Sequence, residues 1–216
     1  MLTVADAVKE IIGQTPFLEE ALARRLINLS SLARTIRRDV ETKTFKKVKI
    51  GSIIMALKRL SLKLKPNKNL RLVFKSSPDL IVRSNLFELT IRNSTEFITN
   101  QRKILNYTTK KDSSFATITH GVFETTIIAS QEVKDKIRQI CRHEKIISKF
   151  DNLSSITVRF SKEIIDTPGV FYTVIKNLFW ENISLVEIVS TYSELTVILE
   201  DTQVDKAFAV IKKLFN

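Results

Sequence analysis

The sequence predicts an α+β protein in which a helical N-terminal region precedes strand-rich segments. Apolar residues recur at helical spacing through residues 1–65. From residue 155 onward, stretches of alternating apolar and polar residues give way to helical stripes and then return. With 216 residues, of which 44% are hydrophobic, the chain is long enough for two or three small domains with a sizeable core.

Residues 1–65 carry four apolar stripes that predict four helices. Gly13 is expected to end the first helix, and Asn28–Ser31 to cap the third. The third and fourth helices and the loop between them resemble a helix-turn-helix, with the fourth in the place of the recognition helix. Three-helix units with this pattern also serve as dimerisation modules, so both roles remain open. The stripes are Val4, Val8, Ile11 and Ile12; Phe17, Ala21, Leu22 and Leu26; Leu32, Ala33, Ile36 and Val40; and Ile50, Ile53, Ile54, Leu57 and Leu60.

Positive charge is concentrated in this helical region. The chain has 35 Lys and Arg against 23 acidic residues, a net charge of +12. Residues 42–65 include eight basic residues and no acidic one. Such a field around a recognition helix suits contacts with DNA phosphates, although runs of lysine also simply solubilise exposed loops. The candidate nucleic-acid-binding residues are Lys46, Lys47, Lys49, Ser52, Lys58 and Arg59.

The middle of the chain predicts a strand-rich segment after a short linker at Pro66–Asn69. Leu70, Leu72 and Phe74 form a strand pattern without an obvious local partner. Between residues 86 and 150 we expect, in order, a strand, a helix, a hairpin around His120 and Gly121, a helix capped by Ser130, and a closing strand. These elements are marked by Phe87, Leu89 and Ile91; Phe97, Ile98, Ile104 and Leu105; residues 115–129; Val133, Ile137, Ile140 and Cys141; and residues 146–150.

Residues 155–216 predict the order strand, helix, strand, strand, helix. Ile156–Phe160 alternates as a half-buried strand, and the turn D-T-P-G-V follows at residues 166–170. We expect Thr167 to cap a helix with Pro168 at its first position. Strands are predicted at residues 184–191 and 194–199. A last helix is expected to open with the capping-box pattern at Thr202–Asp205.

The strings D-T-P-G-V-F-Y-T-V-I and W-E-N-I-S-L-V-E-I-V-S-T-Y-S-E-L-T-V-I-L resemble the ACT domain, most closely the C-terminal ACT pair of aspartate kinases. The resemblance is strong from residue 155 to the end of the chain. It implies two ferredoxin-like βαββαβ ACT units, one inserted in the other. The expected domains are a helical domain (1–65), a linker and a strand that completes the C-terminal unit (66–85), an inserted unit (86–152) and a C-terminal unit (153–216). The inserted unit lacks the P-G turn, so we expect it to pair structurally without binding ligand in the same way.

The same resemblance implies a site for an amino-acid effector between paired ACT units. Unpaired amides at a helix start, with the helix dipole behind them, suit a carboxylate. Asp166 would bind the ligand ammonium, and the amides of Gly169 and Val170 its carboxylate. The chain has N-I-S at Asn182–Ser184 where the family has G-I-N. A purely architectural role for Pro168 and Gly169 is the alternative. The implied ligand-binding residues are Asp166, Thr167, Pro168, Gly169, Val170, Phe171 and Ser184.

No motif in the sequence points to catalysis, a metal or a cofactor. We find no Walker-type glycine loop, G-x-S-x-G or H-E-x-x-H, and therefore expect no enzyme. Cys141 and His143 lack a second ligand pair with zinc spacing. As the only cysteine, Cys141 excludes an intrachain disulfide. The chain has no membrane-length apolar run and begins with an amphipathic helical pattern, so we expect a cytoplasmic protein.

Two functions follow as hypotheses. In the first, the protein is a non-enzymatic regulator that senses a small molecule, an amino acid by resemblance, and binds DNA through its basic helical domain. In the second, it is a structural or interaction protein that dimerises through its ACT pair and docks a protein partner on the helical domain. Both predict a homodimer formed through the ACT units.

Overall fold

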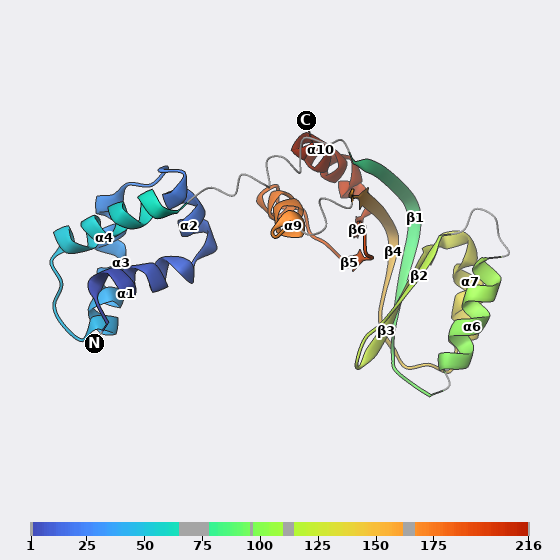
Figure 1. Cartoon of the computed structure of the whole chain (residues 1–216). Coiled ribbons are helices and arrows are strands. Elements are labelled where there is room, and N and C mark those ends of the chain that lie inside the picture. Colours follow the sequence, from blue (N-terminus) through green and yellow to red (C-terminus); the bar gives the residue numbers. More distant parts are fainter. Residues whose placement is uncertain (1, 65–77, 96, 110–114, 162–166, 216) are drawn as a thin grey trace. The chain divides into compact units, whose positions relative to one another are not determined.

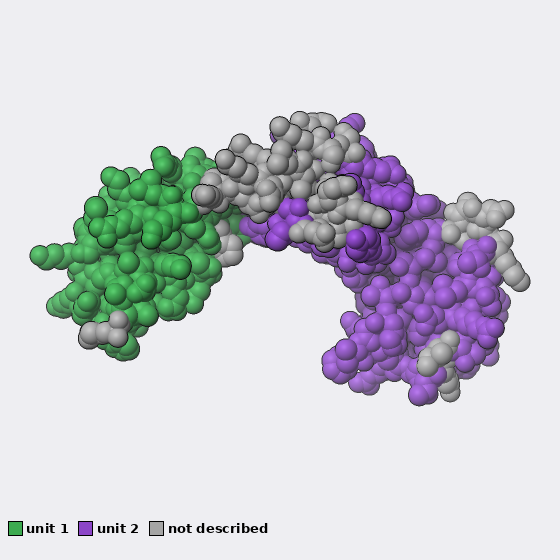
Figure 2. Space-filling view, in the orientation of Figure 1, with its two compact units in different colours: residues 1–68 green, residues 69–216 purple. Residues whose placement is uncertain are grey.

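The computed structural model describes residues 2–64, 78–95, 97–109, 115–161 and 167–215. The chain divides into two compact units, unit 1 (residues 1–68) and unit 2 (residues 69–216), as Figure 2 shows. Each unit has a hydrophobic core of its own. The helices of unit 1 are α1 (Val4–Gly13), α2 (Pro16–Ala23), α3 (Leu29–Thr44) and α4 (Ile50–Lys63).

The four predicted helices of unit 1 are confirmed, and their apolar stripes meet in its core. Asn28 caps α3 as expected: its Oδ1 accepts hydrogen bonds from the amides of Ser30 and Ser31, both at 3.0 Å. The expected inward positions of Phe17 and Leu26 are wrong, because these side chains are 48% and 69% exposed. Leu26 lies beyond the end of α2, which stops at Ala23.

The connection from α3 to α4 is held by a carboxylate. Phe45 ends α3 in the left-handed region, at φ 54°. Glu41 then accepts a hydrogen bond from the amide of Val48 at 3.0 Å, and a second from Arg37 Nε at 2.9 Å. These two hydrogen bonds lower the pKa of Glu41. The loop that carries the predicted basic residues is thereby tied to α3.

Unit 2 is built on one six-stranded antiparallel sheet with the order β2-β3-β1-β4-β6-β5 (Figure 1). All five strand pairs are antiparallel. Short 3₁₀ turns, η1 (Gln131–Val133) and η2 (Asp201–Gln203), lead into two of its helices. The strands are β1 (Asp79–Arg92), β2 (Ala116–His120), β3 (Glu124–Ser130), β4 (Ile146–Arg159), β5 (Glu187–Ser190) and β6 (Glu194–Glu200); the helices are α6 (Phe97–Thr108), α7 (Lys134–Ile140), α9 (Val170–Trp180) and α10 (Val204–Leu214).

Two long strands, β1 and β4, run through both halves of this sheet. Residues 79–83 of β1 pair with residues 155–159 of β4, and the later part of β1 pairs with β3 and with the first part of β4. Asn85 and Asn152, with φ of 61° and 54°, lie where the register shifts. The strands expected at 146–150 and 156–160 are therefore one strand. The linker at Pro66–Asn69 and the strand pattern at residues 70–74 lie outside the described residues.

The four helices cover one face of the sheet. Phe87, Leu89 and Ile91 of β1 share a core with α6 and α7. Ile156 and Val158 of β4 share another core with α9 and α10. Because side chains alternate between faces along a strand, the opposite face carries a separate apolar cluster, on which no described helix packs. This cluster consists of Leu86, Ile128, Leu153 and Ile198.

Three helix starts differ from the sequence prediction. Helix α7 begins at Lys134 with Val133 as its N-cap, and Ser130, expected to cap it, precedes η1 and makes no side-chain cap. Helix α9 begins at Val170 with Gly169 as its N-cap, so Thr167 and Pro168 precede the helix instead of opening it. Glycine occupies the cap because its φ is 92°, in the left-handed region that other residues rarely adopt. Helix α10 begins at Val204, and its N-cap, Gln203, makes no side-chain cap. The capping-box prediction is wrong because Thr202 lies inside the 3₁₀ turn η2.

Candidate functional site

The corner between β4 and α9 holds the residues expected to bind a ligand carboxylate. The carbonyl oxygen of Gly169 accepts hydrogen bonds from Thr173, from its amide at 3.0 Å and from its Oγ1 at 2.8 Å. Among the described residues, none accepts a hydrogen bond from the amides of Val170 and Phe171. Within the described part of the chain, two donors in the first turn of this helix, at its positive end, thus have no acceptor.

This corner is anchored in the core on one side and open on the other. Val170 is 4% exposed and belongs to the core under α9 and α10. The ring of Phe171, 41% exposed, lies 6.0 Å from that of Phe160. Pro168 is exposed and Gly169 is half-buried. The start of α9 therefore lies at the boundary between the core of the unit and its exposed side.

Ser184 lies at the other end of α9. Its amide donates a hydrogen bond to Gln203 Oε1 at 3.2 Å, at the start of α10. The opposite end of α10 lies near the corner, because Phe215 there packs on Phe160. Helix α9 has 11 residues and spans about 16 Å at about 1.5 Å per residue. One chain therefore does not bring Ser184 to the amides of Gly169 and Val170. Asp166, the expected ammonium ligand, lies outside the described residues.

The solvent side of α9 is unusually aromatic for an exposed helix. Phe171 and Tyr172 are 41% and 42% exposed, and Phe179 and Trp180 are 67% and 64% exposed. The rings of Phe179 and Trp180 meet edge to face at 5.8 Å. The strand that follows α9 in the chain, β5, lies at an edge of the sheet and pairs with β6 alone among the described strands. An edge strand and an apolar helix surface are both features of protein interfaces.

The six predicted nucleic-acid-binding residues all lie at the surface of unit 1. None of the five basic ones forms an ion pair with another described residue, whereas Lys43 bonds Glu10 at 2.5 Å. Ser52 and Arg59 line a groove of about 450 Å³ between α4 and the start of α1. Lys58 lies six residues from Ser52, about 120° away around the helix, and does not line this groove. Ser52 and Arg59 thus share one surface, with Lys58 to its side. The other basic residues, Lys46, Lys47 and Lys49, belong to the connection before α4.

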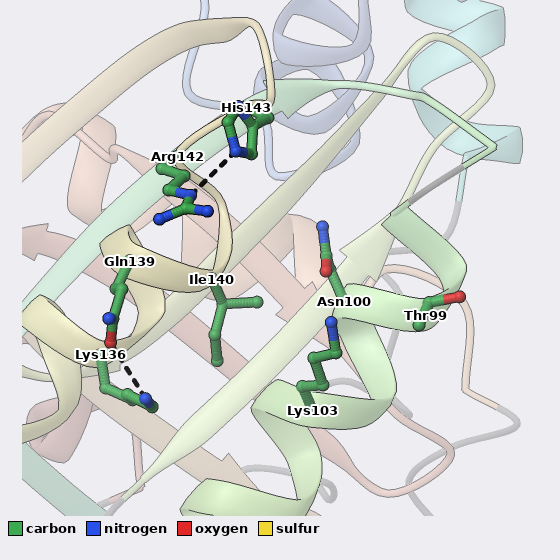
Figure 3. Close-up of a pocket in the computed structure, with 8 residues that line it drawn as sticks. All are labelled: Thr99, Asn100, Lys103, Lys136, Gln139, Ile140, Arg142 and His143. Carbon is green, nitrogen blue, oxygen red and sulfur yellow. Dashed lines mark hydrogen bonds between the residues drawn. The ribbon is translucent and has the colours of Figure 1, made fainter.

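A second groove, which no sequence pattern indicated, lies between α6 and α7 in unit 2 (Figure 3). Two of its cations, Lys103 and Lys136, come from helices that β2 and β3 separate in the sequence, so only the folded chain brings them together. Cys141, adjacent to this groove in sequence, points into the core: it is 1% exposed, and burial, with a smaller effect of Glu144, raises its pKa to about 11. Within the described ranges, no three His, Cys, Asp or Glu residues are placed to hold a metal ion. None of the described helices is both long and apolar enough to cross a membrane.

Comparison with known proteins shows which solved structures share this architecture. No protein-family model and no curated protein sequence matches the chain. Among solved structures, it is similar to aspartate kinase from Clostridium acetobutylicum, with a TM-score of 0.53 and 20% identity over 63% of this chain and 34% of the kinase. It is also similar to a structure of aspartokinase alpha and beta subunits, with a TM-score of 0.52 and 13% identity over 65% of this chain and 99% of that one.

The regulatory subunit of aspartate kinase from Thermus thermophilus is matched over its whole length. The TM-score is 0.53 at 9% identity, over 65% of this chain and 100% of the subunit. The chain spans about a third of the Clostridium kinase but all of this regulatory subunit. At these identities the likeness concerns the fold. The chain therefore shares the α+β fold of aspartate kinase regulatory subunits, as the ACT resemblance of its sequence predicted.

Proposed function

We propose that unit 2 is a non-enzymatic regulatory module that binds a small carboxylate-bearing molecule of the amino-acid type at the corner Thr167–Phe171. The observation that carries this proposal is the pair of amides of Val170 and Phe171, which follow the left-handed Gly169 and have no acceptor among the described residues. The shared fold with regulatory subunits of aspartate kinase supports it. A carboxylate at this position would accept both amide hydrogens and gain from the helix dipole. Asp166, by the family resemblance, remains the proposed partner of the ligand ammonium.

The complete site needs two copies of the chain. Ser184 is a helix length away from the corner of its own chain, so its proposed role requires the corner of a second copy. A two-fold axis beside α9 and β5 would bring each corner to the partner subunit's strand start. It would also cover Phe171, Phe179 and Trp180, the exposed aromatic residues of α9. We therefore propose a homodimer with two shared sites.

Ligand binding is tested by thermal shift with the twenty amino acids and, for each one that stabilises the protein, with its α-carboxamide. A ligand at about a hundred times its dissociation constant adds about 2.7 kcal/mol to the stability of the folded state. The shift should vanish for the carboxamide, because an uncharged amide gains little from the helix dipole. If no amino acid changes the melting temperature, the corner is only a strand-to-helix connection.

The shared site is tested by mixing two variants that each lack one side of it. Gly169→Ala impairs the corner and Ser184→Ala the strand start, so neither homodimer should bind ligand. After exchange, half of the dimers are mixed and each holds one intact site of two, so about a quarter of the wild-type sites should return. Recovery of none, or a monomer by light scattering, would exclude the shared arrangement. A dimer that binds no amino acid would favour the purely structural alternative.

A second function, DNA binding by unit 1, is favoured by one observation. Lys46, Lys47, Lys49, Lys58 and Arg59 are exposed and unpaired among the described residues around the α4 surface that carries Ser52. We propose that this surface contacts DNA phosphates. Affinity for random duplex DNA should fall steeply with salt, and Lys58→Gln or Arg59→Gln should reduce the slope by about one each. Arg34→Gln on α3 makes the same charge change at another exposed position. Equal effects of all three variants, or no binding at low salt, would favour the protein-docking alternative.

A further inference from the structure

A groove of about 530 Å³ lies between α6 and α7 in unit 2. Both helices precede the α9 corner in the chain. Figure 3 shows side chains entering it from both helices and from the residues just after α7. Ile104 of α6 and Ile137 of α7, both fully buried, hold the two walls on a common core. The side chains used below are Asn100 and Lys103 of α6, Lys136 and Gln139 of α7, and Arg142 and His143 after α7.

Two carboxylates are adjacent in sequence to residues that line the groove: Asp135, which is exposed on α7, and Glu144, which is buried. Glu144 is 8% exposed; its Oε2 accepts from Ser94 Oγ at 2.7 Å and its Oε1 from Asn100 Nδ2 at 3.0 Å. These bonds tie the start of α6 to the segment after α7, so the groove is fixed at one end. Both oxygens of Glu144 accept from neutral donors, so its negative charge remains beside Asn100 and offsets part of the positive charge nearby.

Three permanent cations face the groove, and none of the described side chains that line it is acidic. Lys103 comes from one wall, whereas Lys136 and Arg142 come from the other. Lys103 forms no hydrogen bond or ion pair with another described residue. Like charges gathered in one recess repel each other and attract anions. Within the described part of the chain, the groove thus carries an excess of positive charge, which Glu144 behind Asn100 offsets only in part.

The hydrogen bonds within the groove orient the side chains of Lys136 and Arg142, and both side chains keep N–H groups that can bind a ligand. Lys136 Nζ donates to Gln139 Oε1 at 3.0 Å and keeps two further hydrogens. Arg142 Nε donates to His143 Nε2 at 2.8 Å, which leaves both terminal nitrogens of the guanidinium for a ligand. A guanidinium edge of this kind matches two oxygens of one phosphate group.

We propose that this groove binds the polyphosphate group of a small molecule carrying at least two phosphates. Two linked phosphates would supply negative charge to balance Lys103, Lys136 and Arg142, and would offer oxygens to residues of both walls. A volume of about 530 Å³ is in the range of small-molecule sites. The three cations line a single recess, which favours a compact anion over a nucleic-acid strand. This proposal does not depend on the α9 corner.

The test is calorimetric titration of the full chain with tripolyphosphate at fixed ionic strength. Lys103→Gln and Lys136→Gln should each weaken binding about tenfold, the usual effect of losing one charge-assisted hydrogen bond. Arg102→Gln and Arg138→Gln are the matched controls: they lie on the same two helices, are exposed and do not line the groove. Each control should change the affinity less than about twofold, as for a screened distant charge.

Four results would overturn the proposal. The first is an absence of tripolyphosphate binding at low ionic strength. The second is equal weakening by the groove variants and their controls, which would mean general attraction to a basic surface. The third is citrate binding as tightly as tripolyphosphate, which would mean that the groove binds any polyanion and does not select phosphate. The fourth is duplex DNA binding more tightly than tripolyphosphate and depending on Lys103 to the same degree, which would mean that the groove contacts nucleic acid.

Discussion

Glu88 carries a carboxylate that the sheet buries without satisfying it fully. The residue is 5% exposed, and its Oε1 accepts a hydrogen bond from Thr90 Oγ1 at 3.2 Å. Its Oε2 has no partner among the described residues. Burial raises the pKa of Glu88; the Thr90 hydrogen bond opposes this rise and the nearby charge of Glu187 adds to it. Glu88 is therefore a place where the fold loses stability when the group ionises.

This raised pKa sets the sign of a pH dependence. The folded state holds the Glu88 proton to higher pH than the unfolded chain, whose pKa is near 4.5. The contribution of Glu88 to stability therefore falls as pH rises from about 4.5 through the folded-state pKa. Glu88→Gln cannot ionise, so it should be more stable than wild type at pH 8, by about 1 kcal/mol, and similar at pH 4. Urea unfolding at both pH values measures the difference.

Glu124→Gln is the control for this prediction, since Glu124 lies on the neighbouring strand β3 and is exposed. It should leave the pH profile unchanged. A Glu88→Gln variant that loses stability relative to wild type between pH 5 and pH 8 would show that the Glu88 carboxylate is stabilising when charged.

At the scale of elements, the residue at the N-cap decides where a helix begins, through its backbone conformation or its side-chain hydrogen bonds. In α3, the Asn28 side chain accepts hydrogen bonds from two amides of the first turn. In α9, the amides of Val170 and Phe171, which follow Gly169, have no acceptor among the described residues. The first arrangement serves stability and the second leaves donors for a ligand. Because α2, α4, α7 and α10 also begin without a side-chain cap, the left-handed Gly169 is what sets the start of α9 apart from these helices.

The cap of α3 predicts the effect of one substitution. Asn28→Ala removes the acceptor for the amides of Ser30 and Ser31 and should cost about 1 kcal/mol. Asn28→Asp retains the acceptor and should stay within about 0.5 kcal/mol of wild type. Hydrogen exchange of the α3 amides measures both effects. Equal protection in the alanine and aspartate variants would mean that core packing alone positions the helix start.

At the scale of unit 2, the shared strands β1 and β4 join the half of the sheet under α6 and α7 to the half under α9 and α10. Both cores use residues of these strands, and the cluster of Leu86, Ile128, Leu153 and Ile198 lies between them on the opposite face. Separating the halves would require β1 and β4 to break in mid-strand, near Asn85 and Asn152. We therefore expect unit 2 to unfold as one cooperative unit.

This cooperativity is tested with one core substitution in each half. Ile137→Ala and Val174→Ala remove fully buried side chains under α7 and α9, at a cost of about 2–4 kcal/mol each. Each should lower the exchange free energy of the slowest amides in both halves equally. Lys213→Gln, an exposed position on α10, should lower neither. A loss confined to the substituted half would mean that the two halves unfold separately.

The sequence by itself determined the elements and their order. Helical and alternating periodicities located α1 to α4, α6, α9 and the strands of unit 2, because burial of one face imposes a local period that a single chain reveals. The string around Pro168 and Gly169 also indicated the fold that the solved structures share. The helix starts of α9 and α10 were misplaced by one or more residues, because the backbone conformation of Gly169 and the 3₁₀ turn η2 prevailed over capping patterns.

Only the tertiary structure decided what lies together. It joined two predicted strands into β4, placed Ser184 a helix length from the amides of Gly169 and Val170, and brought Lys103 and Lys136 into one groove. None of these relations has a local period, since each depends on strand register or on helix packing between residues distant in the chain. The periodicity of a sequence reports which face of an element is buried, and not which other element covers it.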